Sequence, residues 1–135
     1  MTEQDFQELF DALCSLEGMN YNKARIAATW TLAARGFLGR AVDCLPHLVF
    51  VGTTKGGRDR AVSLVAAAIE GHFVDLTIER RGIVRIDDYD DLSKEDAETV
   101  RNLLLRPKSP MRRPVLMGCG WLSIPESMQA IVVQV

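Results

Sequence analysis

The segment from residue 48 to residue 79 constrains the fold more than any other part of the chain. It begins with the apolar run Leu48–Val51, passes through a glycine-rich stretch at 52–57, and continues with a helical pattern over 58–70. Alternating apolar and polar residues then cover 74–79. A short apolar run is typical of a strand buried on both faces. The segment therefore predicts a central βαβ unit in an α/β protein.

Patterns on either side of this unit complete the expected architecture. Helices are predicted at 2–18, from about residue 20 to 37, and from residue 93 to about 104, and strands at 83–86, 115–117 and 131–135. The strand at 83–86 is expected to pair with 74–78 in a hairpin. We predict one mixed α+β domain over 1–135, with a helical pair at 1–45 and an α/β part at 46–135. The part at 46–135 should hold a mixed sheet of four or five strands.

Composition narrows the class of protein. No apolar run is long enough to span a bilayer, and the acidic start lacks the pattern of a signal peptide, so a cytoplasmic location is expected. The three cysteines, Cys14, Cys44 and Cys119, are widely spaced, which favours free thiols over disulfides or a zinc site. We predict no cofactor and no metal. The net charge of −2 gives no general attraction to nucleic acid or membranes.

The glycine-rich loop at 52–60 is the first candidate site. Backbone N–H groups at the start of a helix, together with the helix dipole, favour an anion. Cations at that position are unfavourable unless something negative meets them. The loop does not match the phosphate-binding loop of nucleotide hydrolases, and a simple chain turn is the alternative. The predicted anion-binding or partner-binding residues are Lys55, Gly56, Gly57, Arg58 and Arg60.

Two charged surfaces are also predicted. An acidic patch of Asp87, Asp88, Asp90 and Asp91 could dock a basic partner or hold a divalent cation, although solvated charges before a helix are the simpler interpretation. A basic patch could grip phosphates, although scattered surface charge is the more frequent explanation for such residues. Its members are Arg80, Arg81, Lys108, Arg112 and Arg113.

Cys119, between Gly118 and Gly120, is a weak candidate for a catalytic nucleophile, with His47 or His72 as its base. A spacer cysteine in a tight loop is the ordinary alternative, since reactivity needs a lowered pKa. No paired acid and base, metal-ligand cluster or nucleotide fingerprint is evident, and this favours a protein that is not an enzyme.

The leading hypothesis is a non-catalytic interaction protein that regulates or inhibits a protein or ribonucleoprotein partner through charged patches. Small chains of this kind are often encoded by bacteria, phages or other mobile elements. The first alternative is a phosphate-directed binder of nucleic acid or nucleotide that uses the loop at 52–60. A second alternative is a small enzyme that uses Cys119. Association with a second copy through the last strand or the alanine-rich helix is a further expectation, and no membrane partner is predicted.

Overall fold

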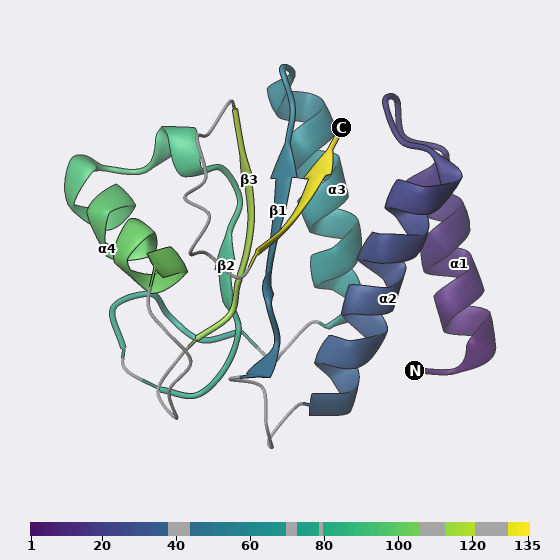
Figure 1. Ribbon diagram of the computed structural model, residues 1–135, viewed down its shortest axis with the longest axis horizontal. Helices are drawn as coiled ribbons and strands as arrows, with labels where there is room; N and C mark the ends of the chain where they lie inside the picture. The colour runs from purple at the N-terminus through teal and green to yellow at the C-terminus, as the bar shows by residue number, and fades with distance from the viewer. Residues whose placement is uncertain (38–43, 70–72, 79, 106–112, 121–129) are drawn as a thin grey trace.

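A four-stranded parallel sheet forms the middle layer of the protein (Figure 1). The computed structural model describes residues 1–37, 44–69, 73–78, 80–105, 113–120 and 130–135. The helices of this part are α1 (Glu3–Cys14), α2 (Tyr21–Phe37), α3 (Lys55–Ala68) and α4 (Lys94–Leu105), with a short 3₁₀ helix η2 (Tyr89–Asp91). The strands are β1 (His47–Val51), β2 (Val84–Ile86), β3 (Val115–Cys119) and β4 (Ala130–Gln134).

The strands lie side by side in the order β2-β3-β1-β4. Helices α2 and α3 cover one face of the sheet, with α1 packed against both of them, and α4 covers the other face (Figure 1). The predicted α/β class and the N-terminal helical pair are confirmed. The sheet is parallel throughout the described strands, not mixed. None of the described helices is long and apolar enough to cross a membrane.

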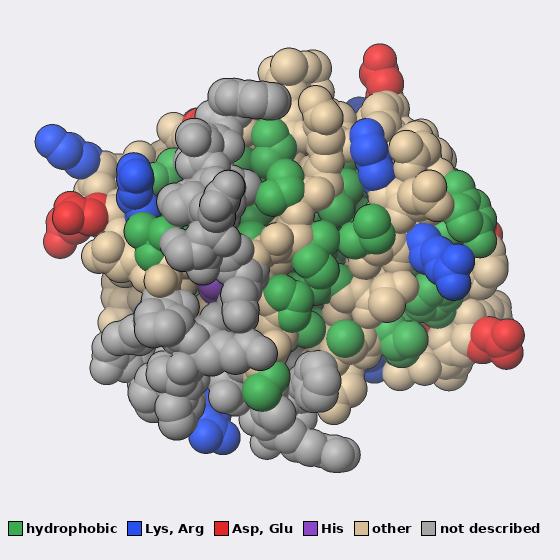
Figure 2. Space-filling model, viewed as in Figure 1, with side chains coloured by type: hydrophobic (Ala, Val, Ile, Leu, Met, Phe, Trp, Pro, Cys, Tyr) green, Lys and Arg blue, Asp and Glu red, His purple; other side chains and the backbone are tan. Residues whose placement is uncertain are grey.

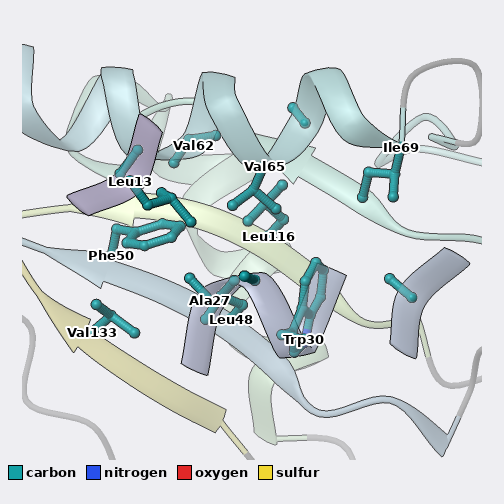
Figure 3. Close-up of a cluster of buried hydrophobic side chains, with 14 of the residues drawn as sticks. Leu13, Ala27, Trp30, Leu48, Phe50, Val62, Val65, Ile69, Leu116 and Val133 are labelled. Atoms are coloured by element: carbon teal, nitrogen blue, oxygen red, sulfur yellow. The ribbon is translucent and has the colours of Figure 1, made fainter. Parts of the chain in front are cut away.

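The central strand β1 is buried along its whole length and divides the core into two clusters. Leu48 and Phe50 point toward the helices on one face, where they share a cluster with Leu13 of α1 and Val65 of α3 (Figure 3). The intervening Val49 packs in the cluster that α4 covers. Burying an aliphatic or aromatic side chain contributes about 1.5–3 kcal/mol, so these alternating contacts fix the strand between its two layers of helices.

Helix α2 packs through its alanines. The helical period alone would place Ile26 on the same buried stripe as Trp30, but Ile26 is 44% exposed. Ala24, Ala27 and Ala28 are fully buried instead. Their small side chains let α2 approach its neighbours closely, and this close approach decides which face turns inward.

Helices α1 and α3 begin at different kinds of signal. In α1, Thr2 and Asp5 have capping-box spacing in the sequence, and they form that capping box in the structure. Helix α3 starts at Lys55, three residues earlier than expected, because Gly56 and Gly57 adopt helical backbone in its first turn. Only residues 52–54 of the predicted anion loop are therefore loop.

The predicted hairpin is wrong. Residues 74–78 form no strand, and one isolated parallel bridge joins Phe73 to Ile83. Strand β2 pairs in parallel with β3, where Val84 lies beside Val115. The βαβ unit is thus β1-α3-β2, with β3 between its two strands.

Candidate functional site

Three loops meet at the edge of the sheet where the strands end. They are residues 52–54 after β1, residues 87–91 after β2, and Gly120 after β3. The carboxyl ends of parallel strands share one edge, which is where open α/β sheets commonly bind ligands. The glycine-rich loop, the acidic patch and the Gly-Cys-Gly turn were predicted as separate sites. The parallel sheet brings them together.

Arg58 lies at the centre of this edge. It sits in the second turn of α3 and its side chain is only 7% exposed. Its Nη1 donates to the Gly52 carbonyl at 2.9 Å. Its Nη2 donates to Asp88 Oδ2 at 3.0 Å and lies 3.6 Å from Asp90 Oδ2. One guanidinium therefore links the end of β1 to the loop after β2.

The same carboxylates extend the network to β3. Asp90 Oδ2 accepts a hydrogen bond from the Gly120 N–H at 2.9 Å. Asp88 Oδ1 accepts from the Asp90 N–H at 3.1 Å and so caps η2. Asp88 is itself buried, with its side chain 4% exposed. We call Arg58, Asp88 and Asp90 the arginine clamp, because together they tie the ends of three strands.

Glycines leave the room that the clamp needs. A Cβ on Gly120 would lie 2.5 Å from Asp90 Oδ2, and a Cβ on Gly118 would lie 3.2 Å from the Arg58 Cβ. On Gly52 it would lie 2.7 Å from the Val135 carbonyl oxygen. Close packing explains these three glycines, whereas the sequence suggested an anion-binding loop at 52–60 and a nucleophile between Gly118 and Gly120.

Lys55 extends beside the clamp and is exposed. It forms an ion pair with Asp91, and its Nζ lies 3.8 Å from Asp88 Oδ2. The hydrogen bond to the Asp91 carboxylate raises the pKa of the Lys55 ammonium, so it stays charged at neutral pH. Two of the three cations in the predicted anion loop are therefore neutralised by the chain's own acids. Arg60 is exposed and lies outside this network.

A pocket of about 340 Å³ opens next to the clamp. Its charged lining carries both signs, and Arg85 Nε donates to Asp87 Oδ1 at 2.7 Å within it. In the described part of the chain, no group of three or more His, Cys, Asp or Glu side chains is arranged to hold a metal ion. The acidic patch therefore offers paired carboxylates and not a set of free ligands. The lining residues are Lys55, Asp59, Arg85, Ile86, Asp87, Asp88, Asp91 and Leu92.

Cys119 ends β3 and is buried. Desolvation in this position raises the pKa of its thiol to about 11. His47 begins β1 and Cys119 lies beside Val51 at that strand's far end, so His47 cannot act as its base. His72 lies outside the described residues. This geometry disfavours Cys119 as a nucleophile, which requires the thiolate.

One predicted member of the basic patch is not at the surface. Arg113 is buried, and its guanidinium donates to the carbonyls of Asp75, Leu76 and Ile78. It holds the segment before β2 in place and is not available to a phosphate. Arg80 and Arg81 are exposed. Lys108 and Arg112 lie outside the described residues.

The most uniform charged surface lies on α1. Residues 1–18 contain five acids and no base, and all five carboxylates are exposed. None of them takes part in an ion pair with any described residue. Their contacts are with uncharged groups, such as the hydrogen bond from Gln7 to Asp11 at 2.8 Å. We call this surface the acidic face of α1; its members are Glu3, Asp5, Glu8 and Asp11 of the helix and Glu17 just after its end.

The sequence revealed this acidic segment, but it could not show that the segment stays unpaired while the acids at 87–91 are used internally.

Comparison with known proteins adds no assignment: no family model, no curated protein and no solved structure matches the chain.

Proposed function

We propose that this protein is a cytoplasmic, non-catalytic interaction protein whose acidic α1 face binds a basic surface on a macromolecular partner and so regulates or inhibits it. One observation carries the proposal. The carboxylates of α1 are exposed and lack ion pairs within the described chain, whereas the cations near the acidic patch are already paired. Of the acidic face of α1 and the acidic patch, only the acidic face therefore offers a partner charge that this chain does not already neutralise, and that charge is negative.

Such a surface acts mainly through long-range attraction. Complementary charges speed association and select the partner, while adding less to the lifetime of the complex. Salt screens exposed charges over about 8–10 Å at 0.1–0.15 M ionic strength. Binding should therefore weaken as salt is raised, mainly through a slower association rate.

The test uses matched neutral substitutions on two helices. Glu8→Gln with Asp11→Asn removes two charges from α1, and Glu95→Gln with Glu98→Gln removes two exposed charges from α4. Each protein is immobilised, and partners captured from extract of the source cells are identified by mass spectrometry. We expect one basic protein or ribonucleoprotein that both the wild type and the α4 variant capture but the α1 variant loses. Equal capture by all three proteins would refute a role for the acidic face.

A phosphate-directed function remains the second candidate because of the start of α3. Thr54 makes no side-chain capping hydrogen bond there, and no acid lies in the first turn. Lys55 in this first turn is paired with Asp91, so a phosphate bound here would compete with that carboxylate for the ammonium. Titration with a labelled oligonucleotide at several salt concentrations tests this. Binding with a steep salt dependence, lost in Lys55→Ala, would support it, and no binding would remove it.

A further inference from the structure

The two edges of the sheet differ in how well they are protected. The β2 edge is only three residues long and carries the charged Arg85. The β4 edge is five residues long, Ala-Ile-Val-Val-Gln, with no charge and no proline. Natural proteins commonly guard an edge strand with a charge, a proline or a bulge. Strand β4 has neither charge nor proline, and among the described strands it pairs with β1 alone.

The backbone of β4 presents hydrogen-bonding groups to this edge. The Val135 N–H donates to the Val51 carbonyl at 2.8 Å, so residue 135 points toward β1. Backbone polar groups alternate in direction along a strand, as the ladder pattern requires. The N–H and C=O groups of Val132 and Gln134 therefore point away from β1. They form the pattern that another strand would recognise.

Apolar side chains flank the edge on both faces of the sheet. On the face of α2, Ile131 joins Ile26 and Trp30 in the lining of a groove of about 400 Å³. On the opposite face, Val132 is 48% exposed. Figure 2 shows hydrophobic side chains over β4 and the neighbouring part of α2. A strand added here would bury apolar surface on both sides as well as pair its backbone.

We propose that β4 pairs antiparallel with β4 of a second copy of this chain, which joins two four-stranded sheets into one. A two-fold axis through the middle of the strand makes this edge its own complement. The absence of charge on β4 means that no like charges oppose each other across the axis. Directly opposed side chains lie on the same face of the sheet in an antiparallel pair. Ile131 of one copy would therefore pack beside the groove of the other copy. The two Val132 side chains would meet on the opposite face. This assembly is independent of the acidic face and goes beyond the proposed function.

The test measures self-association by analytical ultracentrifugation over a wide range of protein concentration. Val132→Lys places two like charges near the axis and also removes the apolar side chains that would be buried there, so it should weaken the dimer by about tenfold or more. The matched control is Leu32→Lys, because Leu32 is 45% exposed on α2 and lies off the groove lining. The control should leave the dimer unchanged, and circular dichroism should show both variants folded.

Amide hydrogen exchange separates this pairing from other arrangements. The amides of Val132 and Gln134 should exchange slowly in the wild-type dimer and quickly in Val132→Lys. A wild type that stays monomeric at the highest concentration overturns the proposal, as does a dimer that Val132→Lys leaves intact. Slow exchange of both amides in a monomer would show that the chain covers its own edge or that a different strand pairs there, and would equally overturn it.

Discussion

Replacing Arg58 by Met should destabilise the protein far more than an ordinary surface substitution. Methionine keeps much of the apolar stem but removes the guanidinium that binds Gly52 and Asp88. Asp88 would then remain buried, with Lys55 Nζ at 3.8 Å as its nearest cation. Breaking a buried ion pair by removing one partner typically costs about 3–5 kcal/mol, because the other charge is left without compensation.

That cost is large against the stability of a domain, which is commonly about 5–15 kcal/mol. For a chain of this size, 1 kcal/mol shifts the melting temperature by roughly 3–5 °C, so Arg58→Met should lower it by roughly 9–25 °C. The exposed pair of Lys55 and Asp91 provides the contrast. Lys55→Met should cost no more than about 1 kcal/mol, since exposed ion pairs contribute little.

Urea unfolding followed by circular dichroism measures these differences, and a double-mutant cycle isolates the pair. If Arg58 and Asp88 act as one unit, Asp88→Asn added to Arg58→Met should cost about 2 kcal/mol less than it does in the wild type. Two results would refute the clamp: an Arg58→Met cost as small as that of Lys55→Met, or strictly additive costs in the cycle.

Three smaller predictions concern other parts of the fold. Gly56→Ala should stabilise the protein by about 0.5–1 kcal/mol in the same urea assay, because a Cβ there meets no atom within 4 Å and alanine favours helix; destabilisation would show that the position needs glycine. Iodoacetamide at pH 7.5 should label the exposed Cys14 and Cys44 but not Cys119 in the native protein, as intact mass and peptide mapping will show. Hydrogen bonds with Thr2 in the α1 cap lower the pKa of the Asp5 carboxyl below its usual value of 3.8. This contribution to stability is therefore present above pH 3.8 and is lost as the pH falls through the depressed value, so Asp5→Asn should flatten the acid limb of a stability profile measured from pH 2 to 6.

Local patterns predicted most of the helices and the two central strands. The capping box of α1 and the apolar run of β1 each depend on neighbours a few residues away, and the structure confirms both. The pairing of β2 was missed for the opposite reason. Gly82 does sit at a turn, with a φ of 149°, but whether the next strand returns antiparallel or joins β3 depends on residues far along the chain.

The candidate site was harder to predict than the fold. Lys55 and Arg58 were expected to face an external anion because cations at a helix N-terminus are unfavourable unless something negative meets them. Their partners come instead from the loop after β2, which sequence reasoning treated as a separate acidic patch. One signal was available: Gly52 and Gly118 stand at the ends of two apolar runs. Had those runs been recognised as adjacent parallel strands, their glycines would have indicated a shared, tightly packed edge.

The position of β1 has a consequence for how the chain folds. Leu48 pairs with Leu116 on one side and with Ile131 on the other, so both partners of the central strand come from the far end of the sequence. Contacts this distant require the closure of long loops and make folding slow. During synthesis, the most apolar strand leaves the ribosome long before either neighbour exists. Versions of the chain truncated before residue 115 should therefore aggregate instead of accumulating as a folded N-terminal fragment.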